Sequence, residues 1–402
     1  MEDAVGGRRY MDEDTEITSE FECGTGDHIR RIGEDHFALD AHRDWGTGDP
    51  YSMMSWVFCV KITNRSSAAR TLKLDVRNIN HSGHDEAYVW AKRGDIWDRA
   101  DASVLPGSDD DWSFRATVRM GAGETLYLSN GYWYPPSEMT TWLTDVAEKH
   151  SDLCTLRDIG RTAQGRPISA LTISDPESTD KKARILIAAS PQGSEIGAWA
   201  CRRLIAFLLS DDAIAEKVRK KWVLDVIPQT NPDGEALGTV MVNALGENPL
   251  FEFKQVADGG SGSAEAVSLW NWAKNRPPAI YLEYHCYYQA NRLSFRPYLF
   301  SSELHRSGKR KALAEEVANR LLEIGTGPPA MVKVGDERFS HCLPYQLIEH
   351  FDTIAHFYKL HMRESLEDNL TQAVRVFRTV VEVCEDIARQ RSAISGQQSS
   401  DS

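Results

Sequence analysis

Apolar and polar residues alternate along the first third of the chain in the manner of β-strands. Residues 55–64 place an apolar side chain at every second position, and residues 71–79 repeat the pattern. Similar short segments follow up to Trp133, separated by Gly, Asp, Asn and Ser. The pattern predicts an all-β sandwich domain over residues 16–133, preceded by a disordered N-terminus over residues 1–15.

Strands and helices alternate in the rest of the chain. The continuous apolar run at 183–190 is typical of a strand buried on both faces. Residues 221–230, 279–287 and 345–351 predict further strands, and apolar residues at helical spacing predict helices between them. This order predicts an α/β domain over residues 134–390, in which helices cover both faces of a mixed, mostly parallel sheet. The polar residues 391–402 are expected to be a disordered tail.

Polar side chains follow the predicted strands at their carboxyl ends, where α/β sheets bind ligands. Gln192 and Glu195 follow the first of these strands, and an Asn-Pro-Asp-Gly turn follows the second. His285 lies on the third predicted strand and Glu349 on the fourth. Each of these features is common alone, whereas their order and spacing together point to a single site.

The ordered motifs resemble those of the zinc metallocarboxypeptidases with the carboxypeptidase A fold. That family carries His-x-x-Glu after a strand, then Asn-Pro-Asp-Gly, then a third ligand histidine and a catalytic glutamate. The resemblance extends over residues 134–390. The preceding region, which includes Trp97 and Arg99, resembles the β-sandwich that comes before the catalytic domain in the cytosolic carboxypeptidase subfamily. The resemblance implies a zinc-dependent hydrolase that cleaves an amide bond in a peptide or an amide-containing small molecule.

The resemblance assigns the metal site residue by residue. Glu195 and His285 match two zinc ligands, Glu349 matches the general base, and Gln192 stands where the family has its first ligand histidine. An amide oxygen is a harder and weaker donor than imidazole, so we expect zinc to be weakly bound or replaced by another divalent metal. Nearby groups that could complete the metal shell are His341, Cys342 and His350, and also Cys286, which adjoins His285 but lies on the opposite face of the strand.

The substrate pocket departs further from the family pattern. Asn243 keeps the register, but Met241 replaces the arginine that polarises the scissile carbonyl. Leu250 and Phe251 replace the Asn-Arg pair that grips the substrate's terminal carboxylate, and apolar side chains cannot make that contact. We therefore predict that recognition of a free C-terminus in the family's way is lost. Two later arginines are candidates for a relocated cation, Arg292 and Arg296.

Two main interpretations follow from these changes. In the first, water on a metal held by Gln192, Glu195 and His285 attacks an amide, and Glu349 transfers the protons. In the second, the chain is a catalytically inactive relative that binds a peptide, a metabolite or a protein partner. A metal-free reaction with His285 and Glu349 as an acid–base pair is a third interpretation, and Cys286 as a nucleophile is a weaker one, because it should point away from His285.

Composition limits the possible binding partners and the cellular location of the protein. The 46 basic and 59 acidic residues give a net charge of −13, which argues against nucleic-acid binding. The sequence has no run of about 18 apolar residues, so no membrane span is expected, and its start lacks the apolar region of a secretory signal. Seven widely spaced cysteines without a Cys-x-x-Cys pair favour reduced thiols. A cytoplasmic protein is therefore expected.

Overall fold

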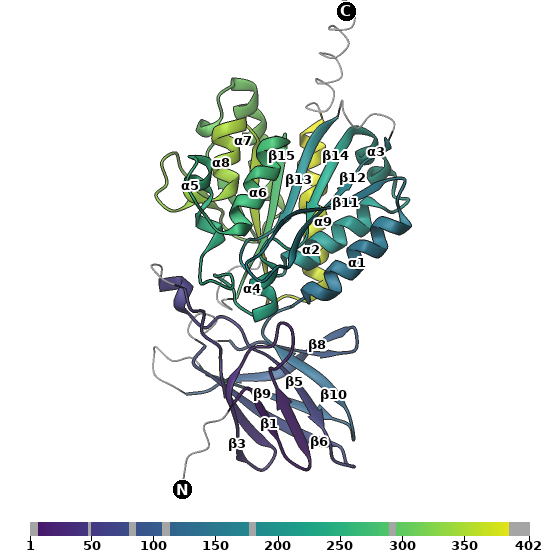
Figure 1. Ribbon diagram of the computed structural model, residues 1–402, viewed down its shortest axis with the longest axis vertical. Coiled ribbons are helices and arrows are strands. Elements are labelled where there is room, and N and C mark those ends of the chain that lie inside the picture. Colours follow the sequence, from purple (N-terminus) through teal and green to yellow (C-terminus); the bar gives the residue numbers. More distant parts are fainter. Residues whose placement is uncertain are drawn as a thin grey trace, which may run out of the picture.

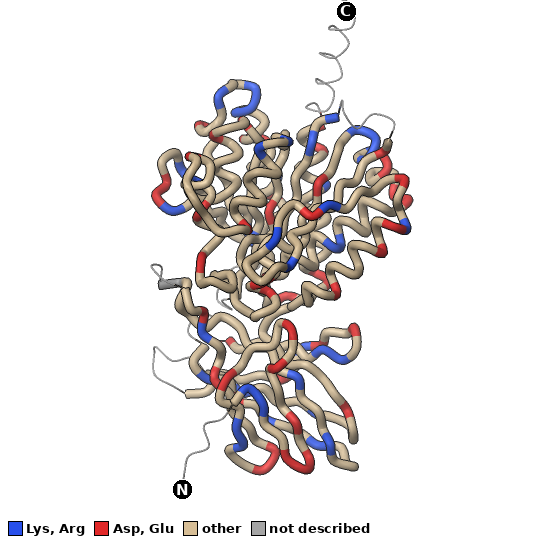
Figure 2. Tube along the Cα trace, viewed as in Figure 1, with Lys and Arg blue, Asp and Glu red and all other residues tan. Residues whose placement is uncertain are grey.

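The computed structural model describes residues 7–46, 50–79, 86–106, 113–176, 182–288 and 295–385. The chain forms an all-β half and an α/β half that lie one above the other (Figure 1). Acidic and basic residues are interspersed along the chain in both halves (Figure 2).

The all-β half is one sheet of ten strands with the order β1-β2-β5-β10-β7-β8-β9-β6-β4-β3. Side chains from both ends of this order share one core, with Ile17, Phe37, Phe58 and Leu74 fully or almost fully buried. That this half is a separate sandwich domain remains a prediction. The strands are β1 (Arg9–Met11), β2 (Thr15–Thr18), β3 (Asp27–Gly33), β4 (His36–Asp40), β5 (Cys59–Asn64), β6 (Arg70–Arg77), β7 (Val89–Arg93), β8 (Ile96–Val104), β9 (Phe114–Met120) and β10 (Thr125–Ser129).

Both ends of the chain were expected to be disordered. Residues 9–11 of the N-terminal segment form strand β1, which pairs with β2 in antiparallel register through Tyr10 and Ile17. The expectation of a disordered 1–15 segment is therefore wrong for this part, because backbone pairing with β2 holds it. The expected tail at 391–402 lies outside the described residues.

The α/β half is built on a mixed sheet of eight strands with the order β11-β12-β14-β13-β15-β18-β16-β17. The central strands β14, β13, β15 and β18 run parallel, and antiparallel pairings flank them. This confirms the predicted α/β architecture. The strands are β11 (Cys154–Arg161), β12 (Pro167–Ile173), β13 (Ala183–Ala189), β14 (Trp222–Ile227), β15 (Ile280–Tyr287), β16 (Arg296–Phe300), β17 (Ala330–Val332) and β18 (Ile354–His361).

Helices cover both faces of this sheet. In β13, Ile185 and Ile187 join the core beneath α1, α2, α3, α7 and α9, while Leu186 and Ala188 join the core beneath α5, α6 and α8. Among the described residues, no helix combines the length and the apolar character needed to cross a membrane. The helices are α1 (Pro136–Lys149), α2 (Gly197–Leu208), α3 (Ala213–Lys221), α4 (Pro232–Leu237), α5 (Phe253–Ala257), α6 (Ala264–Asn275), α7 (Gly308–Ile324), α8 (Leu343–Phe351) and α9 (Leu366–Val383), with 3-10 turns η1 (Pro50–Met53), η3 (Pro249–Phe251), η4 (Ser302–Leu304) and η5 (Phe339–His341).

One predicted strand is a helix. Residues 345–351 belong to α8, in which Leu343 and Leu347 are both buried at a spacing of one turn. Asp352 then adopts a left-handed conformation, with φ 56°, and ends the helix. The strand itself is β18, which follows at once and pairs in parallel with β15. A short apolar run fits either a helix turn or a strand, and the side-chain packing decided here.

The two halves are joined beside the carboxyl ends of β15 and β18. The Tyr88 hydroxyl donates a hydrogen bond to the carbonyl of Tyr288, and the Trp90 indole N–H donates to the carbonyl of Met362 over 2.7 Å. All four residues are buried. The all-β half is therefore held directly against the edge of the sheet at which α/β folds place their ligands.

Candidate functional site

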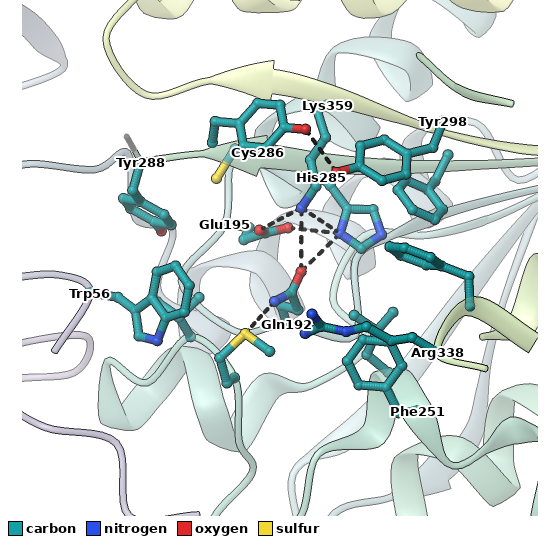
Figure 3. Close-up of a pocket in the computed structure, with 16 residues that line it drawn as sticks. Trp56, Gln192, Glu195, Phe251, His285, Cys286, Tyr288, Tyr298, Arg338 and Lys359 are labelled. Atoms are coloured by element: carbon teal, nitrogen blue, oxygen red, sulfur yellow. Dashed lines mark hydrogen bonds and ion pairs between the residues drawn. The ribbon is translucent and has the colours of Figure 1, made fainter. Parts of the chain in front are cut away.

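A cavity of about 330 Å³ opens at the carboxyl ends of β13, β15 and β18. Both halves contribute to its wall, because Trp56 lines it together with residues of the α/β half. Figure 3 shows Tyr288, Tyr298 and Phe251 around a central group of polar side chains. The volume lies at the low end of the range for small-molecule sites, which is about 300–1,000 Å³.

The loop after β13 delivers two of the predicted ligands. Gln192 is fixed by its backbone N–H, which donates to the Ser190 hydroxyl over 3.0 Å. Gly193 packs against α4 so closely that a Cβ there would lie 2.6 Å from the carbonyl oxygen of Thr239. Only glycine fits this position without displacing backbone, so the loop is pressed against α4 and Gln192 and Glu195 are held at the cavity.

The structure brings the three predicted metal ligands together. Nδ1 of His285 lies 3.0 Å from Oε1 of Gln192 and 3.3 Å from Oε2 of Glu195. Each of the three residues is less than 10% exposed, and all three line the cavity. The three side chains therefore converge at the rim of the sheet, and their role as metal ligands stays a prediction.

A fourth polar residue, Lys359, lies at the point where the three converge. Lys359 belongs to strand β18 and is paired in register with His285 on the neighbouring strand β15. Its Nζ lies 3.3 Å from Nδ1 of His285 and 3.5 Å from both Oε1 of Gln192 and Oε1 of Glu195 (Figure 3). An ammonium group has three donors and no acceptor, so it matches the oxygens of Gln192 and Glu195 that converge there.

Lys359 is a site residue that the sequence patterns did not reveal. The one available signal was a lysine in phase with Ala355 and Phe357, both of which are buried. A strand predicted at 345–351 ends the predicted sheet before residue 352, so the pattern assigns no strand to 354–361. Because the predicted strand lies about ten residues before β18, the sequence pattern does not indicate Lys359.

Charge interactions keep Glu195 ionised although it is buried. Burial by itself would raise the pKa of this carboxyl group, but the positive charge of Lys359 and the neighbouring His285 outweigh it and hold the pKa below the ordinary value. The ion pair thus offsets the cost of placing a carboxylate in the interior.

A second buried carboxylate orients the histidine. Nε2 of His285 is hydrogen-bonded to Glu283, which also accepts a hydrogen bond from the Tyr281 hydroxyl. Glu283 is 1% exposed. A carboxylate that binds one ring nitrogen directs the other nitrogen towards its partner. Nδ1 of His285 therefore faces Gln192, Glu195 and Lys359.

These residues do not fit the zinc ion that the family resemblance implies. A catalytic zinc site takes three strong protein ligands, and here only Glu195 and His285 are of that kind. The Lys359 ammonium would lie against the ion, and the repulsion between a divalent and a monovalent cation about 4 Å apart is on the order of 8 kcal/mol at an effective dielectric constant of 20. Within the described ranges, no group of three or more His, Cys, Asp or Glu side chains could hold a metal.

The predicted general base does not reach the cavity. Glu349 is exposed on α8, where its Oε2 accepts a hydrogen bond from Gln346 over 3.4 Å, and it is not among the residues that line the cavity. The expected position beside His285 is therefore wrong, because the segment is helical and turns this side chain outward. The metal-free acid–base interpretation loses its base for the same reason. Three of the suggested extra metal ligands also lie outside the cavity lining: His341, Cys342 and His350.

Three of the four predicted pocket residues line the cavity. Met241, Leu250 and Phe251 contribute apolar surface, and the sulfur of Met241 contacts the amide nitrogen of Gln192. Asn243 lies behind the wall and donates hydrogen bonds to Glu247 and Glu265 over 2.8 and 3.0 Å. Its role is to hold the loop that carries Met241.

Of the remaining candidates, the structure describes Arg296 and Cys286, and it adds Arg338. Arg338 lines the cavity, with its guanidinium 4.8 Å from the ring centre of Phe251, and the sequence did not indicate it. Arg296 instead lies over Tyr298, outside the lining, and Arg292 falls outside the described residues. Cys286 is buried, and burial raises the pKa of its thiol well above the ordinary value, so it is a poor nucleophile.

Comparison with known proteins finds relatives of the α/β half. Residues 139–279 match the zinc carboxypeptidase family. Cytosolic carboxypeptidase 2 of Danio rerio is 26% identical over 256 residues, which are 57% of this chain and 35% of that protein. Cytosolic carboxypeptidase 6 of Caenorhabditis elegans is 29% identical over 168 residues, which are 39% of this chain and 36% of that protein. The chain thus spans about a third of the length of these relatives.

Solved structures extend the likeness to both halves. A metallo-carboxypeptidase from Burkholderia cenocepacia superimposes with a TM-score of 0.77 at 15% identity, covering 93% of this chain and all of the other. A metallo-carboxypeptidase from Pseudomonas aeruginosa, solved with (2-guanidinoethylmercapto)succinic acid, gives 0.71 at 15% identity and covers 93% of this chain and 99% of the other. At this identity the likeness establishes the carboxypeptidase-like fold.

Proposed function

Because this chain is a relative of the zinc carboxypeptidases, we propose that it keeps their cleft as a binding site for a peptide or a small amide-containing ligand and does not hydrolyse that ligand with zinc. The observation that carries the proposal is the position of Lys359, whose Nζ lies within 3.5 Å of Gln192, Glu195 and His285.

The metal-dependent hydrolysis that the sequence favoured requires two things at one point, a divalent cation and a carboxylate base. Lys359 supplies a monovalent cation that has no open coordination position for water. Glu349 is on the exposed side of α8, and the buried carboxylates of Glu195 and Glu283 are already engaged with Lys359 and His285. These contacts support the alternative in which the cleft binds and does not cleave.

The cavity itself supports a binding role. Its wall combines aromatic rings such as Trp56 and Tyr288 with the apolar Met241, and these surround the polar cluster around Lys359. Apolar walls with a few placed polar groups are the usual composition of small-molecule sites. A cytoplasmic location is part of the same proposal, and all seven cysteines are unpaired thiols.

The proposal is tested by zinc binding in four proteins: the natural chain, Gln192→His, Lys359→Gln and the double variant. We expect no zinc binding by the natural chain in calorimetry at up to 100 µM zinc. The double variant should bind at least 100-fold more tightly than either single variant, because it restores an imidazole ligand and removes the competing charge. Matched controls are the exposed substitutions Gln255→His and Lys220→Gln.

Hydrolysis and ligand binding are measured on the same proteins. A panel of N-acetylated dipeptides is followed by mass spectrometry for cleavage and by thermal shift for binding. We expect shifts in the melting temperature without cleavage for the natural chain, and loss of the shifts in Phe251→Ala. One zinc per natural chain that survives dialysis, together with zinc-dependent cleavage, would overturn the proposal.

A further inference from the structure

A second and larger hollow lies between helices α2 and α9, away from the cleft. Its volume is about 700 Å³, and every residue that lines it belongs to one of these two helices. The helices pack against each other through the core, and the groove runs along their outer surfaces. Because it shares no lining residue with the cleft, this groove needs a separate explanation.

The floor of the groove is apolar. Phe207 from α2 and Val374 from α9 are half-buried there, and Leu370 is 7% exposed. The lined part of α9 runs from Leu370 to Glu382, which at 1.5 Å per residue corresponds to about 18 Å, or a little over three helical turns. A groove between two helices with this length matches the geometry that accepts a third helix.

The rim of the groove is basic. Arg203, Arg375 and Arg378 line it, and Glu382 is the acidic residue among the lining side chains. Arg203 forms an ion pair with the neighbouring Glu367. Arg375 and Arg378 are exposed, and neither has an ion-pair partner within 4 Å among the residues that the structure describes.

This basic rim differs from the chain as a whole, which has a net charge of −13. Two unpaired arginines beside an apolar strip favour a ligand that has both carboxylates and apolar side chains. From this complementarity we propose that the groove between α2 and α9 docks an acidic amphipathic helix of a partner protein. Its apolar face lies on Phe207 and Val374, and its carboxylates bind Arg375 and Arg378.

The test uses the full chain and a fluorescent synthetic helix of about 16 residues, with Leu at positions i, i+3, i+4 and i+7 and Glu elsewhere. Fluorescence anisotropy measures binding at 50 and 200 mM salt. We expect saturable binding that weakens at least threefold at the higher salt. The double variant Arg375→Glu/Arg378→Glu should weaken binding at least tenfold, and Val374→Asn should weaken it without introducing a charge.

The control is Arg65→Glu/Arg119→Glu, which makes the same change in net charge at exposed positions in the all-β half. It should bind as the natural chain does. A second probe replaces every Glu of the helix by Lys and should not bind. Equal affinity in the rim and control variants, equal binding of the Lys probe, no binding of the Glu probe, or binding of anionic vesicles in its place would each overturn the proposal. Circular dichroism and melting temperature establish that each variant is folded.

Discussion

Lys359 and His285 lie side by side on adjacent parallel strands, with Nζ of the lysine 3.3 Å from Nδ1 of the histidine. The contact places the amine of Lys359 between the three side chains that a metal would otherwise join. It gives Oε1 of Glu195 a positively charged partner in the interior, while Oε2 has no hydrogen-bond partner among the described residues. The site therefore resembles that of a metalloenzyme in its acceptors and differs from it in the nature of the cation.

Removal of this charge should destabilise the protein strongly. In Lys359→Met the carboxylate of Glu195, which is 4% exposed, loses its nearest positive charge. Breaking one side of a buried ion pair costs about 3–5 kcal/mol. Urea unfolding measures the difference, and Lys220→Met, which breaks an exposed pair with Glu216, should cost far less, because water already solvates both charges. Similar losses in the two variants would contradict an internal role for Lys359.

Stability should depend on pH through Asp44, which joins the two halves. Its carboxylate accepts hydrogen bonds from the backbone N–H groups of Val240 and Met241, the latter over 2.7 Å. Burial raises the pKa of Asp44 from 3.8 to about 7, against the opposing effect of these hydrogen bonds and of His42. The folded protein therefore retains a proton that the unfolded chain releases.

The stabilising contribution of that proton is fully present below pH 3.8 and is lost as the pH rises through 7. The shift corresponds to roughly 4 kcal/mol at most. Asp44→Asn has no such proton, so its unfolding free energy should fall less than that of the natural chain between pH 5 and pH 8. Urea titrations at four pH values measure this difference. The exposed substitution Asp145→Asn should leave the pH profile unchanged, and a parallel profile for Asp44→Asn would refute the prediction.

The interface between the halves offers a further test. Tyr88→Phe removes a hydroxyl that donates to the carbonyl of Tyr288, and leaves that buried oxygen without this donor. An unsatisfied buried acceptor costs about 1–3 kcal/mol. The substitution should lower the unfolding free energy by that amount without changing the secondary structure seen in circular dichroism. Tyr10→Phe, which removes a partly exposed hydrogen bond to Asp12, serves as the control and should cost less.

The outward position of Glu349 predicts a neutral substitution. Glu349→Gln should change the unfolding free energy by no more than about 0.5 kcal/mol, because the side chain is exposed and its hydrogen bond to Gln346 is weak. Ligand-induced thermal shifts should equal those of the natural chain. A loss of ligand binding in this variant would indicate that Glu349 lies in the site and would contradict its outward position on α8.

The local sequence by itself was sufficient to predict most of the strands and helices. The alternation of apolar residues in 55–64 and 71–79 was sufficient for β5 and β6, and the continuous run at 183–190 for β13. These segments were predictable because side-chain period follows directly from strand geometry and burial. The order of the motifs around Gln192, Glu195 and His285 likewise pointed to one rim of one sheet.

Only the tertiary structure decided what lies at the centre of that rim. Residues 345–351 and 354–361 are both short and apolar, and their periodicity does not distinguish a helix from a strand. Leu347 of α8 packs into the core and β18 pairs with β15, so the first segment is a helix and the second a strand. As a result Lys359, and not Glu349, lies at the site. Contacts between strands distant in sequence leave no local periodic signal, so the cation of this site could be identified only once the strands were paired.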